Sequence, residues 1–355
     1  MLVLQVHIDR LLKGMAEARN LMCGKAQEGE FFMQGKDFNE RGMSFDGFCT
    51  CVRMDIQKRL GDGYSVKEES VIKNNDIRMK GISITEQGMN ISPNIYLEGY
   101  YEAYRAGSTL REIEDSVIQS YQASKAEARF DTDLFKDWKR IRDKVIYKLV
   151  NYDRNRELLE DVPHRRFLDL AIVYECFLGA DSNGGATILI HDNHMDLWGV
   201  TADELYETAC RNTPELMGGT FASMDKVLLE IMDCDGAEMD GMEGLPSREE
   251  LAKDISALHV LTNRYKLHGA GCILYENILK GISEKWGCDI IILPSSIHET
   301  ILLPEDGTRR CDELAQIVSE INRTQVSPDE VLSDNVYQYV RKTGKIIMQG
   351  EKEYE

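Results

Sequence analysis

Residues 289–304, DIIILPSSIHETILLP, form the chain's most concentrated run of branched apolar residues. Pro294 interrupts the run, and proline suits a turn better than the middle of a central strand because it has no N–H to donate. Apolar runs on either side of a polar turn are typical of a β-hairpin. The stretch therefore predicts two buried strands, residues 290–293 and residues 297–303, with polar side chains gathered at the bend.

Patterns elsewhere in the chain also predict antiparallel strands, and they add capped helices. Residues 65–107 alternate apolar and polar positions around residues 73–75 (KNN), which indicates antiparallel strands joined by a turn. Ser108 or Thr109 precedes one segment of helical periodicity and Thr201 precedes another, as N-caps do. The sequence thus predicts an α+β fold with antiparallel β-hairpins covered by capped helices. A strand pair, turn and capped helix recurs along the chain, which raises a repeated hairpin–helix unit as a further hypothesis.

The same patterns predict how the chain is divided. Apolar residues at helical spacing begin near residue 43, and the charged run ASKAEARFDTD at residues 123–133 is typical of a solvated connection. The predicted parts are an N-terminal extension that is helical and then loose (1–42), an N-terminal α+β module (43–125), a C-terminal α+β module (126–345) and a frayed tail (346–355).

Composition and charge limit the partners of the protein. Apolar residues make up 43% and charged residues 29% of the 355 residues, which is ordinary for a globular protein with a substantial core. No stretch approaches the roughly 20 apolar residues of a membrane span. The net charge of −19 makes direct binding to phosphate backbones unfavourable. We therefore predict a soluble protein that binds neither membrane nor nucleic acid directly.

The cysteines indicate the compartment. Nine cysteines are scattered along the chain without a CxxC pair, and this odd count argues against a disulfide framework. Residues 1–15 mix charges into a short apolar pattern and show no small-residue cleavage site. Reduced thiols without an export signal together predict a cytoplasmic protein.

The bend of the hairpin holds the candidate catalytic residues Ser296, His298 and Glu299, whose types suit a nucleophile, a base and an orienting acid. If residues 296–300 are strand, Ser296 and His298 share a face while Glu299 points to the other, so these neighbours alone do not form a triad. The alternative is that the serines tie a tight turn. The weak candidates for binding a ligand are Ser295 and Asn263.

The sequence predicts no metal and no cofactor. His191 and His194, the weak candidates for a metal, form an HxxH pair, but they follow an expected strand, on which positions i and i+3 point to opposite faces. Residues 269–271 (GAG) precede an expected strand rather than a helix, so they lack the free N–H groups that hold phosphate. The acidic tract at residues 233–243 departs from the ligand order of a calcium loop and is expected to be solvated.

Short motifs between residues 43 and 339 also carry a family resemblance. The motifs are Lys73-Asn74-Asn75, Gly81-Ile82, Asn90-Ile91-Ser92-Pro93, Ile95-Tyr96-Leu97-Glu98, Tyr100-Tyr101, Leu261-Thr262-Asn263, Gly269-Ala270, Leu293-Pro294-Ser295-Ser296-Ile297-His298-Glu299 and Val331-Leu332-Ser333-Asp334. On these residues, above all PSSIHE at 294–299, the chain resembles an uncharacterised Firmicute family catalogued as domain of unknown function 5688. The resemblance implies an origin in gut bacteria or their mobile elements, and it implies no activity.

The sequence leaves three functions open. Because no complete catalytic constellation is visible, the leading hypothesis is a binding or regulatory module that acts on a protein or a small ligand. The alternative is a hydrolase that uses the Ser/His cluster at residues 294–299, with His298, Ser296 and a distant acid. The third is an acidic decoy that occupies a nucleic-acid-binding protein through its negative surface.

Overall fold

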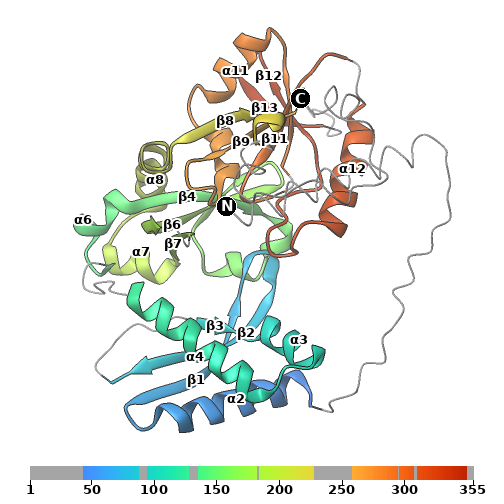
Figure 1. The fold of residues 1–355 in the computed structure, drawn as a ribbon. Helices are drawn as coiled ribbons and strands as arrows, with labels where there is room; N and C mark the ends of the chain where they lie inside the picture. Colours follow the sequence, from blue (N-terminus) through green and yellow to red (C-terminus); the bar gives the residue numbers. More distant parts are fainter. Residues whose placement is uncertain are drawn as a thin grey trace, which may run out of the picture. The chain divides into compact units, whose positions relative to one another are not determined.

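The computed structural model describes residues 43–87, 94–127, 135–181, 184–227, 258–294, 296–307 and 310–349 (Figure 1). These residues form two compact units, residues 43–140 and residues 141–349. Both units combine helices with antiparallel sheets, which confirms the predicted α+β class. The predicted extension (1–42) and the end of the predicted tail (350–355) lie outside the described residues. No helix within the described ranges is long and apolar enough to cross a bilayer.

The N-terminal unit is an antiparallel sheet packed with helices. In chain order its elements are α2 (Phe45–Leu60), β1 (Tyr64–Ile72), η1 (Asn74–Asp76), β2 (Arg78–Glu86), β3 (Asn94–Tyr96), α3 (Glu98–Ala106) and α4 (Leu110–Glu127). The strand order is β1-β2-β3. Asn75 lies in the turn between β1 and β2 with φ 62°, a left-handed conformation that asparagine tolerates well. The turn predicted at residues 73–75 is therefore confirmed.

Capping side chains begin α2 and α4. At the start of α2 the Ser44 hydroxyl accepts a hydrogen bond from Gly47 N–H at 3.2 Å. At the start of α4 the Thr109 hydroxyl accepts from Glu112 N–H at 3.3 Å, and the Glu112 carboxylate accepts from Thr109 N–H at 2.8 Å. This reciprocal pair is a capping box and confirms the predicted cap at Thr109. The apolar faces of α2, α3 and α4 then share one core with the sheet.

The C-terminal unit contains two antiparallel sheets. In chain order its elements are α6 (Trp138–Ile141), which begins just before the unit, η2 (Arg142–Lys144), β4 (Val145–Asn151), η3 (Asp153–Asn155), η4 (Leu158–Glu160), β5 (His164–Phe167), β6 (Leu170–Asp181), β7 (Gly184–Leu189), α7 (Asp192–Trp198), α8 (Ala202–Met217), β8 (Gly219–Ser223), β9 (His259–Asn263), η5 (Gly269–Leu274), α11 (Ile278–Trp286), β10 (Ile290–Leu293), β11 (Thr300–Pro304), α12 (Cys311–Thr324), β12 (Tyr337–Val340) and β13 (Lys345–Met348). One sheet has the order β13-β12-β10-β11-β9-β8. In the other, β6 has β4 on one edge and β5 and β7 in tandem along the opposite edge.

The predicted hairpin is confirmed and lies in the middle of the larger sheet. β10 pairs with β11 in antiparallel register, with Leu293 opposite Ile301. Both residues belong to an apolar core that includes Val318 of α12. On the opposite face of the sheet, Ile292 and Leu302 are also fully buried. Burial on both faces explains why this stretch reads as an almost continuous apolar run.

The second strand of the hairpin begins at Thr300, later than predicted. The preceding chain is bound to a different segment, because Ser296 forms an isolated bridge with Val331. Residues 297 and 298 then bend before β11 begins. The strand geometry expected for Ser296 and His298 therefore does not apply to them.

Two other local predictions are corrected. The strand expected after residues 269–271 is instead the 3-10 helix η5, because β9, which precedes it, is already flanked by β8 and β11. A short apolar run cannot by itself distinguish these outcomes. Residues 345–348, most of which were assigned to the frayed tail, form β13 and pair with β12.

Helix α8 covers the outer edge of β4. The Thr213 hydroxyl accepts a hydrogen bond from Tyr147 N–H at 3.0 Å, and the Asn212 amide donates to Val145 O at 3.1 Å. The helix begins at Thr201, whose hydroxyl accepts from Glu204 N–H at 3.2 Å, which confirms the predicted cap. These side chains satisfy strand groups that would otherwise remain unpaired in the interior.

Asp169 ties the segment before β12 to the smaller sheet. Its Oδ2 atom accepts hydrogen bonds from Ser333 Oγ at 2.6 Å and from Asn335 Nδ2 at 2.9 Å, and its Oδ1 atom accepts from the Tyr337 hydroxyl. Ser333 N–H also donates to Pro294 O at 3.0 Å. The segment is thus fixed against the bend of the hairpin as well as against the smaller sheet.

Candidate functional site

A buried ion pair with an attached histidine lies in the C-terminal unit. Lys148 of β4 and Glu175 of β6 are diagonal neighbours on paired strands, with Lys148 opposite Val173. Lys148 Nζ lies 2.6 Å from Glu175 Oε1, and His268 Nδ1 lies 2.9 Å from Glu175 Oε2. The Glu175 side chain is only 3% exposed, while those of Lys148 and His268 are 13% exposed. We call these three residues the Lys148–Glu175–His268 triad.

The surroundings of the triad decide its charges. Burial raises the pKa of the Glu175 carboxyl, but its contacts with His268 and Lys148 more than reverse this and hold that pKa well below its usual range. Burial also lowers the pKa of His268, and the carboxylate of Glu175 does not offset the effect. We therefore place the negative charge on Glu175, the positive charge on Lys148, and a neutral imidazole at His268 at pH 7.

The protonated nitrogen of His268 follows from its partner. An ionised carboxylate only accepts hydrogen bonds, so Nδ1 of His268 carries the proton that it donates to Glu175. Nε2 then has a lone pair. This arrangement fixes one tautomer and one ring orientation, as the acid does in an acid–histidine dyad.

The backbone at His268 is held in an unfavourable conformation. His268 has φ 53° and Lys266 has φ 54°, both in the left-handed region that residues other than glycine seldom adopt. Asn263 holds this turn, because its Oδ1 atom accepts from Leu267 N–H at 3.2 Å and its Nδ2 atom donates to Leu267 O at 2.6 Å. The predicted ligand candidate Asn263 thus shapes the loop that presents His268.

The bend at residues 294–299 contributes a second imidazole. His298 stacks on His268 with ring centroids 5.6 Å apart and an interplanar angle of 18°. Its Nδ1 atom accepts a hydrogen bond from His268 N–H at 3.3 Å, and its Nε2 atom lies 3.6 Å from Glu330 Oε1. The predicted site residue His298 therefore adjoins the triad and lies next to a carboxylate.

The other predicted residues of the bend have different environments. Ser296 is fully buried, and its hydroxyl accepts from His298 N–H at 3.0 Å, so this hydroxyl shapes the bend. Glu299 is also buried. Thr262 Oγ1 donates to His298 O at 2.7 Å and fixes the bend to β9. Ser295 lies outside the described residues.

The HxxH pair forms the start of a helix. His191 is the N-cap of α7, and its N–H donates to His194 Nδ1 at 3.0 Å. The expectation that the two side chains point to opposite faces is wrong, because they lie on a helical turn and not on a strand. His191 Nδ1 also lies 3.1 Å from Asp161 Oδ2. Among the described residues no group of three or more His, Cys, Asp or Glu side chains is placed to hold a metal ion, and the acidic tract at 233–243 lies outside them.

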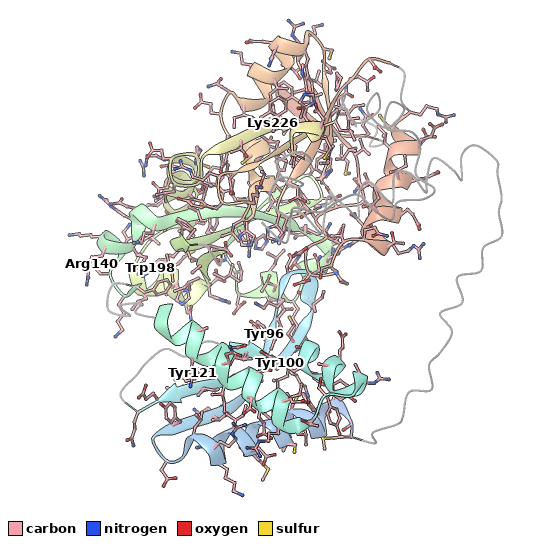
Figure 2. All side chains as sticks on the ribbon, viewed as in Figure 1. Tyr96, Tyr100, Tyr121, Arg140, Trp198 and Lys226 are labelled. Carbon is pink, nitrogen blue, oxygen red and sulfur yellow. The ribbon has the colours of Figure 1, made fainter. Side chains whose placement is uncertain are left out.

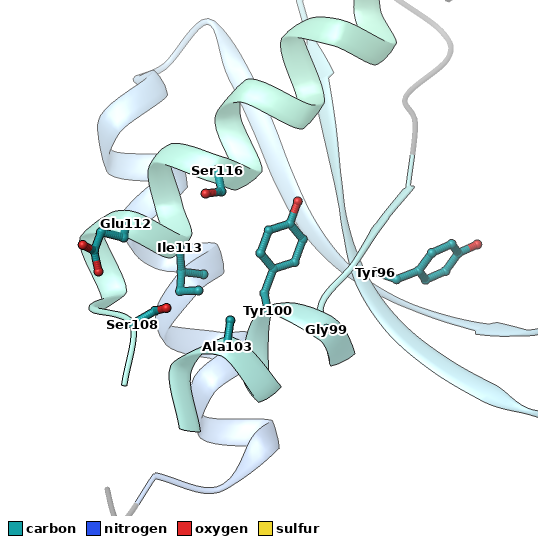
Figure 3. Close-up of a pocket in the computed structure, with 8 residues that line it drawn as sticks. All are labelled: Tyr96, Gly99, Tyr100, Ala103, Ser108, Glu112, Ile113 and Ser116. Atoms are coloured by element: carbon teal, nitrogen blue, oxygen red, sulfur yellow. The ribbon is translucent and has the colours of Figure 1, made fainter. Parts of the chain in front are cut away.

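A pocket of about 410 Å³ lies on the N-terminal unit (Figure 3). Tyr96 of β3 and Tyr100 of α3, labelled in Figure 2, line it together with Ala103 and Ile113. Glu112 lies at the pocket as well, and hydrogen bonds from the Thr109 backbone and hydroxyl lower the pKa of its carboxyl. The pocket therefore combines aromatic and aliphatic walls with one ionised carboxylate.

Comparison with known proteins identifies a family and no activity. Residues 45–341 match the model of a family of unknown function, DUF5688. The match covers most of the chain and confirms the expected resemblance. No curated protein and no solved structure matches the chain.

Proposed function

The chain belongs to the DUF5688 family of unknown function, and we propose that its C-terminal unit is a hydrolytic site in which His268 is the general base. In this proposal Nε2 of His268 takes a proton from a water molecule as the water oxygen attacks the electrophilic centre of the substrate. The same proton then passes to the departing group, and His268 returns to its neutral form. Glu175 orients the ring and stabilises the imidazolium that forms in between.

The environment of the His268 ring carries this proposal. A buried carboxylate binds Nδ1–H, and no hydrogen bond to Nε2 is found within the described part of the chain. The side chain is still 13% exposed. A neutral, oriented imidazole with an available lone pair is what a general base requires near pH 7.

The free-energy cost of the buried ion pair and of the backbone conformation at His268 supports a functional role for the triad. A buried ion pair contributes little net stability compared with apolar side chains of similar size, because both charges lose their hydration. The left-handed backbone at His268 adds a further cost of about 1–3 kcal/mol. Groups with perturbed protonation and strained backbone cluster at functional sites more often than elsewhere. The predicted hydrolase class is thus kept, but the base changes from His298 to His268 and water replaces Ser296 as the attacking group.

Replacement of His268 by asparagine tests the proposal. We expect kcat to fall about 10²–10⁴-fold, the usual contribution of a positioned acid–base group. The measurement uses a panel of chromogenic esters, phosphate esters and glycosides, on whichever member the wild-type chain hydrolyses. His164→Asn is the matched control, because His164 lies on β5 and its Nδ1 contacts only the backbone of Val162 among the described residues. Equal rates for His268→Asn and wild type, or no turnover of any panel member by wild type, would contradict the proposal.

The pocket of the N-terminal unit favours a second function, the predicted binding or regulatory module. Its apolar walls of Tyr100, Ala103 and Ile113 suit the body of a small ligand or an apolar side chain of a protein. The carboxylate of Glu112 adds a preference for positive charge. A fragment library enriched in amines, screened by chemical-shift changes of Tyr100 and Ala103, tests this function independently of the first.

We also propose a cytoplasmic location. Support comes from the seven cysteines of the described ranges, which are free thiols. The net charge of −19 supports the absence of direct nucleic-acid binding, and it also supports the acidic-decoy alternative.

A further inference from the structure

His298 contacts His268 in two ways that together fix the position of the base. Its ring stacks on the His268 ring, and its Nδ1 atom accepts the His268 N–H at 3.3 Å. We infer that neutral His298 is a positioning residue for His268, and that protonation of His298 releases His268 and switches the site off. The inference rests on the proposed function, because it assigns His298 a role that acts through the base.

The hydrogen bond to Nδ1 exists only while this nitrogen is unprotonated. A protonated ring nitrogen is a donor and can no longer accept from His268 N–H. The lost bond is one of the contacts that hold His268 at φ 53°. A left-handed backbone persists only while surrounding contacts over-determine it. Protonation of His298 therefore weakens the conformation that presents His268 to a substrate.

Glu330 lies beside the second ring nitrogen of His298. Its Oε1 atom lies 3.6 Å from His298 Nε2, and both side chains are less than a quarter exposed, at 16% for His298 and 24% for Glu330. The carboxylate therefore faces the ring nitrogen that does not bond His268. Glu330 is held beside the bend, because its carbonyl oxygen accepts from Ile297 N–H at 2.9 Å. Glu330 thus helps to fix the bend that carries His298.

Other titratable groups also lie near His298. The titratable groups near it are His268 and Glu330, the neighbouring Glu299 on its own segment, and Lys148 and Glu175 beyond His268. A positive charge on both stacked rings would be mutually repulsive.

Two variants of His298 separate its hydrogen bond from its charge. His298→Asn places an amide oxygen near the position of Nδ1, so it keeps an acceptor but cannot take up a proton. His298→Ala removes both properties.

The first measurement does not depend on activity. In the full chain labelled with ¹⁵N-histidine, the amide resonance of His268 is followed from about pH 8 to about pH 5, the range in which imidazoles titrate. We expect a sigmoidal shift in wild type and no corresponding step in His298→Asn. A His268 amide that does not titrate in wild type, or that titrates equally in His298→Asn, overturns the inference.

The second measurement uses the substrate found in the hydrolysis panel. We expect His298→Asn to lose less of the wild-type kcat/KM than His298→Ala, and to keep its remaining activity at lower pH. We expect His298→Ala to lose about tenfold or more, the equivalent of one lost hydrogen bond at the base. Equal losses in the two variants overturn the positioning role. An amide that titrates as expected in a chain that hydrolyses nothing supports the switch and contradicts only the proposed hydrolysis.

Discussion

Replacing Glu175 by alanine is expected to lower the free energy of unfolding by about 3–5 kcal/mol, the usual cost of removing one partner from a buried ion pair. The variant would leave Lys148, whose ammonium lies 2.6 Å from the carboxylate and whose side chain is 13% exposed, as an uncompensated buried charge. It would also leave His268 Nδ1–H without its acceptor. Urea unfolding monitored by circular dichroism measures the change, provided that the m-value stays constant.

Two controls show whether the effect comes from burial. Glu320→Ala breaks an exposed pair with Arg323 and should change stability far less, because solvent screens that pair. The double variant Lys148→Met, Glu175→Leu replaces the pair with apolar side chains and should recover most of the loss. A Glu175→Ala chain as stable as Glu320→Ala would show that the triad is not buried as described.

The same triad makes stability depend on pH. The native state lowers the pKa of His268, so the unfolded chain binds its proton more readily, and this contribution is present above about pH 6.5 and lost as the pH falls. The lowered pKa of Glu175 adds a second loss of the same sign below about pH 4.3. We therefore expect unfolding free energy to fall as the pH drops from 7 to 5, and to fall less steeply in His268→Asn. His194, whose pKa is lowered by burial and by His191, contributes in the same direction, so His194→Asn serves as the comparison.

Local features of the sequence were enough to predict much of the fold. The proline in the run at residues 289–304 and the KNN motif at residues 73–75 marked two turns, and both hairpins are present. Thr109 and Thr201 marked the starts of two helices, because capping depends only on nearby residues. Predictions failed where a distant partner decided the outcome. Ser296 pairs with Val331 and not with β10, so β11 begins at Thr300 and not at residue 297 as predicted.

The candidate site could be predicted only in part for the same reason. His298 was identified from the distinctive PSSIHE motif, but its contacts come from other segments. Glu175 and His268 are 93 residues apart, and no periodicity links them. One signal was available, because Glu175 is the single charge within the apolar stretch LAIVYECFL, and a buried acid needs a partner. The identity of that partner follows only from the pairing of β4 with β6 and from the loop after β9.

Gly269→Ala is expected to be the most damaging small substitution near the site. A Cβ atom at this position would lie 2.1 Å from Thr262 Oγ1, 2.5 Å from His298 O and 2.8 Å from Asn263 N. Two of these atoms are backbone atoms, and Thr262 Oγ1 is held by its hydrogen bond to His298 O. None of the three can move without displacing β9 or the bend. Overpacking a rigid site costs about 1–3 kcal/mol and occasionally more, and we expect the upper end of this range or a failure to fold.

Gly281→Ala provides the matched comparison, because it adds the same methyl group where there is room. Gly281 lies inside α11, and a Cβ atom there would meet nothing within 4 Å. Alanine favours a helix over glycine by about 0.8–1.0 kcal/mol, so this variant should be more stable than wild type. Thermal unfolding of both variants measures the contrast, and the His268 amide resonance of any folded Gly269→Ala chain should shift because the His298 carbonyl is displaced. Equal melting temperatures for the two variants would mean that η5 does not pack against β9 and the bend, and His268 and His298 would then lose the scaffold that brings their rings together.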